Sequence, residues 1–294
     1  MDLLTELRSR PLVFDGAMGT QLIAAGYRPV ESPESWNVSN PEVVADIHRA
    51  YLAAGADIIE TNSFGGSRSK LTAYHEAERV AELNGAGARL ATAVRDEVAP
   101  DKLVAGDIGP SGRMMPPLGD ATADELRDVF AEQSEALAAA GVDLIAMTTF
   151  FDLAEAKAAV LGARAMVGSL PVVISMAFKP SPRGYRTMMG VTPAQAAATL
   201  LEAGADVVGA NCEITGQDMP GLVAEFRAAT DAPLVIQPNA GQPSLVDGHT
   251  TYGETPESFA SFMPAIVAAG ANIVGGCCGT TPAYIAALVA ALRG

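Results

Sequence analysis

The sequence predicts an α/β fold in which eight parallel strands and their helices close into a single (β/α)8 barrel of the TIM type. Short apolar runs alternate with longer alanine-rich segments of helical spacing along all 294 residues. The runs are continuously apolar, which is typical of strands buried on both faces, and the intervening helices require parallel crossover connections. The number of these units and the length of the chain match an eight-stranded barrel.

Eight apolar runs are expected to form the wall of this barrel. Each is followed by a longer helical pattern, so that strand and helix alternate from one end of the sequence to the other. The expected strands are residues 12–14, 57–60, 103–105, 143–146, 172–175, 206–209, 234–236 and 272–274.

A repeated four-residue phrase marks the start of every second strand. It reads Ala-Gly-Ala-Asp at 54–57, Ala-Gly-Val-Asp at 140–143, Ala-Gly-Ala-Asp at 203–206 and Ala-Gly-Ala-Asn at 269–272. The glycine suits the left-handed residue that closes a helix, and the acid or amide suits the turn that follows. Because no linker or low-complexity tract interrupts this pattern, we expect residues 1–294 to form one barrel domain without a second domain.

The composition limits the classes of partner and the compartment. Hydrophobic residues make up 49% of the chain, which is enough for a large core, and the net charge is −15 with no basic block. This charge argues against nucleic acid and anionic membrane surfaces as partners. The N-terminal segment carries acids where a signal peptide would carry positive charge, and no apolar run reaches membrane-spanning length. Free thiols without a signal peptide predict a cytoplasmic protein.

Two adjacent cysteines and one distant cysteine predict a metal site. Cys277 and Cys278 lie between glycine pairs directly after the expected last strand, and Cys212 follows the expected sixth strand. Adjacent cysteines rarely bond to each other, and an odd total leaves one thiol unpaired, which argues against a disulfide framework. Three thiolates supply three corners of a tetrahedral zinc site and leave the fourth open for substrate, as in catalytic sites. The alternative is that these cysteines are small buried apolar residues.

Polar side chains follow the other expected strands, at the end of the barrel where such folds place their chemistry. The three cysteines should converge there from strands six and eight, with Asn239 between them on strand seven. The further candidates for binding the substrate at this mouth are Asp15, Glu60, Asn62, Thr148 and Lys179.

Several of these motifs together resemble the homocysteine S-methyltransferase family. They are residues 15–20 (Asp-Gly-Ala-Met-Gly-Thr), 60–64 (Glu-Thr-Asn-Ser-Phe), 211–212 (Asn-Cys), 238–241 (Pro-Asn-Ala-Gly) and 275–282 (Gly-Gly-Cys-Cys-Gly-Thr-Thr-Pro). Residues 36–41 and 117–120 make the chain most similar to the homocysteine-binding module of cobalamin-dependent methionine synthase. The resemblance runs from about Leu12 to the end of the chain, and the double-cysteine motif is its most specific part.

The resemblance implies a zinc-dependent barrel that activates homocysteine as a zinc thiolate. The thiolate takes a methyl group from a corrinoid, a betaine or a methylsulfonium, and the product is methionine. The ligands of Zn²⁺ would be Cys212, Cys277 and Cys278, which act in catalysis through the metal. Asn239 would approach the metal in the absence of substrate, and Asp15 would help to hold the ammonium group of the substrate. A corrinoid donor would arrive free or on a separate protein, because the chain shows no cobalamin- or folate-binding module.

One departure from the family pattern concerns the acceptor thiol. The family usually has a glutamate at the position of Thr148, where it neutralises the substrate's ammonium, and the loop after strand five carries three cations, Lys179, Arg183 and Arg186. One hypothesis is a thiol that lacks the amino group or carries an anionic group held by these cations. The other is that Asp15, Glu60 and backbone carbonyls suffice for homocysteine.

Three other readings remain open from the sequence alone. A class I aldolase would use Lys179 to form a Schiff base. A phosphate cradle would use Gly275, Gly276 and the start of the last helix, but it gives the cysteines no role. A non-catalytic zinc-binding barrel would hold a four-coordinate metal without substrate.

Overall fold

The structure is a computed structural model that describes residues 2–246 and 249–294. The wall of the barrel consists of strands β1 (Leu12–Val13), β2 (Ile58–Glu60), β3 (Leu103–Ile108), β4 (Leu144–Phe150), β5 (Val172–Met176), β8 (Val207–Thr215), β9 (Leu234–Asn239) and β12 (Ile273–Val274). They form one sheet in the order β1-β12-β9-β8-β5-β4-β3-β2, in which every pairing is parallel. A parallel bridge between Phe14 and Ile58 joins the two ends of this sheet. The (β/α)8 barrel predicted from the sequence is therefore confirmed.

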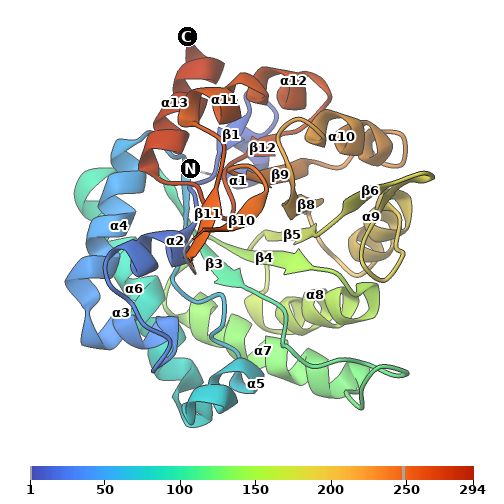
Figure 1. Cartoon of the computed structure of the whole chain (residues 1–294). Coiled ribbons are helices and arrows are strands. Elements are labelled where there is room, and N and C mark those ends of the chain that lie inside the picture. The colour runs from blue at the N-terminus through green and yellow to red at the C-terminus, as the bar shows by residue number, and fades with distance from the viewer. Residues whose placement is uncertain (1, 247–248) are drawn as a thin grey trace.

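Helices surround the strands on the outside, except the short helix at the N-terminus, whose Leu3 joins the apolar cluster inside the barrel (Figure 1). They are α1 (Leu3–Glu6), α2 (Met18–Ala24), α3 (Trp36–Ser39), α4 (Pro41–Ala53), α5 (Arg68–Leu71), α6 (Val80–Val98), α7 (Ala123–Ala139), α8 (Leu153–Val167), α9 (Pro193–Glu202), α10 (Met219–Arg227), α11 (Pro256–Ser261), α12 (Met263–Ala268) and α13 (Pro282–Arg293). Single 3₁₀ turns occur at Pro33–Ser35, Thr72–Tyr74 and Ala77–Arg79. Within the part of the chain that the structure describes, no helix is both long and apolar enough to cross a membrane.

Alternate residues of each strand belong to two separate apolar clusters, because successive side chains of a strand point to opposite faces. The inner cluster fills the barrel with residues such as Leu12, Ile58 and Leu144, and Leu3 and Leu7 at the N-terminus join it. The outer cluster lies between the strands and the helices. Burial on both faces explains why the strands read as continuous apolar runs.

Each of the eight expected runs coincides with a strand, but five strands continue past their expected ends, namely β3, β4, β5, β8 and β9, and two of these contain bulges. β4 reaches Phe150 and β8 reaches Thr215, where polar residues replace the apolar pattern. Both extensions contain a shift in register, between Met147 and Phe150 and between Asn211 and Thr215. The apolar pattern ends where the bulges begin, so it could not mark the true ends of these strands.

The repeated Ala-Gly-X-Asp/Asn phrase forms the same contact four times, at the end of the barrel where the strands begin. Each acid or amide accepts the backbone N–H of the preceding strand, namely Val13 to Asp57, Val104 to Asp143, Val172 to Asp206 and Leu234 to Asn272. An arginine donates to each of these side chains as well, namely Arg10, Arg95, Arg164 and Arg227. We call these four arrangements the strand clamps. Each clamp ties one strand to the next along the chain.

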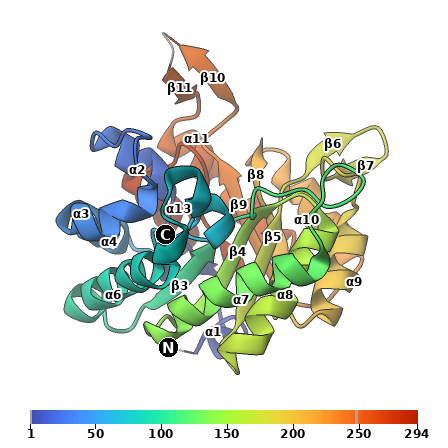
Figure 2. The same ribbon diagram turned by 90° about the horizontal axis from the view of Figure 1, so that it is seen from below.

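Two hairpins extend the other end of the barrel, where the strands finish. One is formed by β6 (Lys179–Ser181) and β7 (Gly184–Arg186), and the other by β10 (Pro243–Val246) and β11 (His249–Tyr252). Figure 2 shows the β10–β11 hairpin projecting beyond the barrel, at the opposite end from α1. The cation-rich loop predicted after strand five is therefore a hairpin.

A close approach of two strands makes Gly209 the wall position most sensitive to an added methyl group. A Cβ atom at this residue of β8 would overlap the backbone carbonyl of Val235 in β9. We expect Gly209→Ala to lower the free energy of unfolding by about 1–3 kcal/mol, as overpacking does in cores. Urea unfolding should measure this loss, with Gly19→Ala as a control, because a Cβ at Gly19 meets no atom within 4 Å. Equal stability of the two variants would contradict the prediction.

Candidate metal and thiol-binding site

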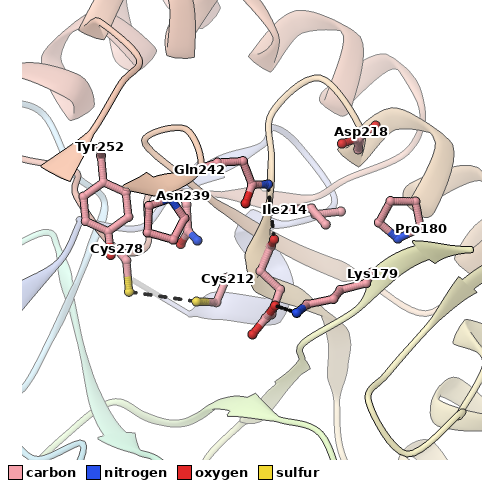
Figure 3. A pocket seen from close by; sticks show the side chains of 11 residues that line it. Lys179, Pro180, Cys212, Ile214, Asp218, Asn239, Gln242, Tyr252 and Cys278 are labelled. Carbon is pink, nitrogen blue, oxygen red and sulfur yellow. Dashed lines mark hydrogen bonds and ion pairs between the residues drawn. The ribbon is translucent and has the colours of Figure 1, made fainter. Parts of the chain in front are cut away.

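The structure brings the three cysteines together at the mouth of the barrel. Their sulfur atoms all lie within 4.8 Å of one another, and the Sγ atoms of Cys212 and Cys278 are 3.9 Å apart (Figure 3). Zn–S bonds of about 2.3 Å in a tetrahedral site place sulfurs about 3.8 Å apart. The donor set and its spacing therefore fit a zinc ion, and the role of the three cysteines as ligands stays a prediction.

Backbone hydrogen bonds fix the loop that carries the cysteine pair. Cys277 N donates to Pro238 O at 2.8 Å, and Cys278 O accepts from Ala240 N at 3.0 Å. Thr280 Oγ1 donates to Cys277 O at 2.7 Å. The pair is thereby anchored to the end of β9 without any contact that depends on the sulfur atoms.

Cys212 occupies an unusual backbone conformation in the bulge of β8. Its φ is 61°, and that of Glu213 is 58°, which is the left-handed region that non-glycine residues rarely adopt. Such a conformation costs on the order of 1–3 kcal/mol per residue and is concentrated at functional sites. The strain accompanies a turn of the Cys212 side chain toward Cys278.

Asn211 joins the cysteines to the neighbouring strands, and sequence reasoning did not select it as a site residue. Its Oδ1 accepts from Thr149 N and Ser175 Oγ, both at 2.8 Å. Its Nδ2 donates to Thr149 Oγ1 at 2.7 Å and to Cys277 Sγ at 3.5 Å. The signals in the sequence were its position next to Cys212 and its place in the Asn-Cys motif at 211–212. Its contacts hold β4, β5 and β8 in one arrangement around the sulfur atoms.

The close approach of the thiols separates their pKa values. Hydrogen bonding with Cys212, and then with Cys277, lowers the pKa of Cys278. The corresponding interactions with Cys212 and Cys278 raise the pKa of Cys277. The Cys278 thiolate is thus stabilised by hydrogen bonds from the protonated neighbouring thiols. A bound cation would replace those protons and stabilise the thiolate charge instead.

A cavity of about 590 Å³ opens beside the cysteines. Figure 3 shows Cys212, Cys278 and Asn239 facing it together with Tyr252. The Oδ1 atom of Asn239 is buried and has no hydrogen-bond partner among the described residues. Tyr252, which comes from the β10–β11 hairpin, was not predicted, because nothing in the sequence shows that this hairpin folds back over Cys278.

Two carboxyl groups, those of the buried Asp15 and the half-buried Glu60, lie at the ends of β1 and β2. Asp15 Oδ2 accepts from Glu60 N at 3.0 Å, and Glu60 Oε2 accepts from Gln237 Nε2 at 3.4 Å. The other oxygen of each carboxyl group is buried and meets no donor in the described parts of the chain. Burial raises the pKa of both groups, and the charge of Asp107 raises both further. Each group therefore has an oxygen available for a cationic ligand.

The structure gives two of the other predicted site residues local partners. Both N–H groups of the Asn62 amide are used, one toward Pro33 O at 2.8 Å and one toward Asn37 Oδ1 at 3.0 Å. This geometry favours a structural role in joining two loops. Thr148 is buried and donates from Oγ1 to Asp107 Oδ1 at 2.9 Å.

Lys179 does not have the surroundings that a Schiff-base lysine needs. Its side chain is 65% exposed, and Nζ lies 2.7 Å from Glu213 Oε2. The hydrogen bond with Glu213 raises the pKa of Lys179, whereas a Schiff base requires a depressed pKa. The geometry therefore gives the aldolase reading no support.

The glycines beside the cysteines are packed by the protein itself. A Cβ atom at Gly275 would lie 2.7 Å from Phe14 Cβ, and one at Gly276 would overlap the side chain of Thr280. These glycines allow close packing of the loop against β1, so the geometry gives no support to a phosphate cradle at this position.

Comparisons with known proteins agree with these observations. The model of the family described as homocysteine S-methyltransferase matches residues 12–292. The chain is 36% identical over 302 residues to the methionine synthase of Mycobacterium tuberculosis and 35% identical over 305 residues to that of Mycobacterium leprae. These alignments cover 99% of the chain but only 25% of each relative, so the chain spans about a quarter of their length.

A solved structure has the same fold over almost its full length. The metallated form of the homocysteine methyltransferase MmuM from Escherichia coli superposes with a TM-score of 0.82 at 28% identity, covering 99% of both chains. A methyltransferase from Methanosarcina mazei, at 12% identity and a TM-score of 0.61, shares the fold alone.

Proposed function

Because the chain belongs to the homocysteine S-methyltransferase family, we propose that it methylates homocysteine in a zinc-dependent reaction that yields methionine. The observation that carries this proposal is the set of three sulfur atoms within 4.8 Å of one another, beside a cavity at the barrel mouth. Cys212, Cys277 and Cys278 would hold the ion. Bound there, zinc would act as a Lewis acid that lowers the pKa of a substrate thiol, so that a nucleophilic thiolate is present at neutral pH.

The rest of the site orients the amino acid. The free oxygens of Asp15 and Glu60 are buried acceptors that meet no donor among residues 2–246 and 249–294, which suits the ammonium group of homocysteine. Asn239 lies at the wall of the cavity, and its Oδ1 has no partner in the described part of the chain, so it is available to the incoming thiol or to the metal before substrate arrives. The protein thus binds the charged end of the substrate inside the barrel and leaves the sulfur end near the cysteines.

A thiol without an amino group is the less favoured substrate. Such a thiol would leave the buried carboxyl groups without a cation. Lys179, one of the three cations proposed with Arg183 and Arg186 as partners of an anionic group, already pairs with Glu213. These contacts favour homocysteine over the altered acceptor, although Thr148 occupies the position where the family usually has a glutamate.

The methyl donor and the partner follow from the same similarity. We propose a corrinoid carried on another protein, with a methylsulfonium or a betaine as the alternatives, since two relatives that align with almost the whole chain are methionine synthases. The cavity of about 590 Å³ beside Cys212 and Cys278 gives a donor room to reach the sulfur atoms. Three thiols within reach of one another suit a reducing compartment, so we place the reaction in the cytoplasm.

Zinc X-ray absorption of the purified protein, recorded before and after addition of homocysteine, tests this function. We expect three sulfur ligands without substrate and four with it, because the substrate thiol fills the open position. Four protein ligands that homocysteine does not displace would instead indicate a non-catalytic zinc barrel. A protein that binds no zinc at all would contradict the proposal.

A further inference from the structure

Glu213 follows Cys212 in the bulge of β8 and has no role in the function described so far. Regular pairing of β8 with β9 is interrupted between Asn211 and Thr215, so both residues lie in the irregular part of the strand. Both also have a positive φ, which costs free energy that the surrounding contacts must offset. The direction of the Cys212 side chain therefore depends on what holds this short stretch of backbone.

Each of the two hairpins at the barrel mouth supplies one contact to Glu213. Lys179, the first residue of β6, places Nζ 2.7 Å from Glu213 Oε2. Gln242, directly before β10, donates from Nε2 to Glu213 O at 3.5 Å. The dashed lines from Lys179 and Gln242 in Figure 3 mark these two contacts. Asn211 thus fixes the chain before Cys212, and Glu213 fixes the chain after it.

A direct effect of the two charges on a metal ion would differ in sign from an effect through the backbone. The hydrogen bond with Glu213 raises the pKa of Lys179, and the charge of the Cys212 thiolate adds to this, so the ammonium group lies within electrostatic reach of that sulfur. As a bare charge, the ammonium of Lys179 would repel zinc and the carboxylate of Glu213 would attract it. As partners in one ion pair, the two would both help to hold Cys212. Single substitutions therefore separate the two effects.

We propose that Glu213 is a positioning residue for the metal site, and that its ion pair with Lys179 keeps the bulge of β8 in the conformation that directs the Cys212 sulfur toward the other two cysteines. This inference rests on the proposed function, because it requires zinc bound by the cysteines. Its consequence is kinetic, since a Cys212 that is held less firmly lets zinc leave sooner. The β6–β7 hairpin is then part of the metal site, although none of its residues is a ligand.

Release of zinc from the zinc-loaded protein to an excess of the chromogenic chelator 4-(2-pyridylazo)resorcinol tests the inference. We expect Lys179→Met and Glu213→Gln each to speed release by about two- to fivefold, which is the effect of losing a partly exposed ion pair. The double variant should release zinc no faster than the faster single variant, because the two residues act as one unit. Lys179→Arg, which keeps the cation, should release zinc at nearly the wild-type rate.

The matched control is Lys157→Met, which makes the same substitution at an exposed lysine on the outer helix α8. It should leave the rate of zinc release unchanged. Urea unfolding of the metal-free proteins separates positioning from general damage, since the variants should lose no more stability than the loss of a surface ion pair allows. Should Glu213→Gln fail to fold, the comparison of methionine with arginine at position 179 still decides the question.

Two results would overturn the inference. Slower release from Lys179→Met together with faster release from Glu213→Gln would mean that the two residues act on zinc only as charges. Release at the wild-type rate from both single variants would leave Glu213 without a role at the metal site. Failure of the proposed function has a different signature, since the wild-type protein would then bind no zinc.

Discussion

We expect Cys278→Ser to lower the proposed methyl transfer to homocysteine by at least about a hundredfold. Changes in groups that merely support a metal ligand cost about 10–100-fold in affinity or activity, and loss of a ligand costs more. The two remaining sulfur atoms would not retain zinc against a chelator. The measurement is zinc content after dialysis, together with methylation of homocysteine by methyl-corrinoid, methylsulfonium and betaine donors.

The fold of this variant should remain intact. The loop is held by the backbone groups of Cys277, Cys278 and Ala240, none of which depends on the Cys278 sulfur. The metal-free wild-type protein and the metal-free variant should therefore unfold at nearly the same urea concentration. Ser261→Ala, an exposed position on α11, serves as the control for activity. Full zinc content and normal turnover in the Cys278 variant would contradict the assignment.

Replacement of Asp57 by asparagine should lower the free energy of unfolding by about 3 kcal/mol, since removal of one partner from a buried ion pair costs 3–5 kcal/mol. The Asp57 side chain is fully buried, and it accepts from Arg10, Lys102 and the backbone N–H of Val13. Arg293, on the last helix, pairs with the same carboxylate. The partly exposed cations can hydrate after the change, which keeps the expected loss at the lower end of that range.

Denaturant unfolding of Asp57→Asn measures this loss, and Asp46→Asn is the matched control. Asp46 forms a surface ion pair with Arg49 at 2.8 Å, with 74% of its side chain exposed. Such pairs contribute about 0.2–1 kcal/mol. Similar losses of unfolding free energy in the two variants would contradict the prediction, since the buried ion pairs of Asp57 would then contribute no more than the surface pair of Asp46.

The same pair of proteins should show a pH dependence with a defined sign. Burial raises the pKa of Asp57, but the hydrogen bonds from Arg10 and Lys102 outweigh it, and the pKa lies below the ordinary value of 3.8. A depressed pKa in the folded state contributes stability that is complete above the unfolded pKa of about 3.9. The stability difference between wild type and Asp57→Asn should therefore be constant near neutral pH and decrease as the pH falls below about 4.

The sequence predicted what depends on strand direction and apolar pattern. Parallel strands finish at one end of a barrel, so cysteines at the ends of two strands had to lie on the same side of the molecule. It could not predict what depends on the bulges. The left-handed backbone at Cys212 and Thr149 is set by tertiary contacts, and residues there follow neither strand periodicity nor helix periodicity.

The sequence pattern also could not predict which distant residues form hydrogen bonds with the side chains at the strand ends. Thr148 reads as the loss of a glutamate, and only the structure shows that its hydroxyl holds Asp107 on the adjacent strand. Asn62 reads as a free polar side chain at a strand end, whereas its amide is used between two loops. In both cases the side chain's partner lies more than 20 residues away along the chain.

The strand clamps divide the wall into four pairs of strands, or quarters, namely β1–β2, β3–β4, β5–β8 and β9–β12. All four quarters have the same clamp at the end of the barrel where the strands begin, but their loops differ at the end where the strands finish. The hairpin β6–β7 is an insertion in the third quarter, and β10–β11 is an insertion in the fourth. Both leave the clamp of their own quarter unchanged. A barrel built this way can lengthen the rim that carries the cysteines one quarter at a time, so that rim can diverge while the wall stays the same.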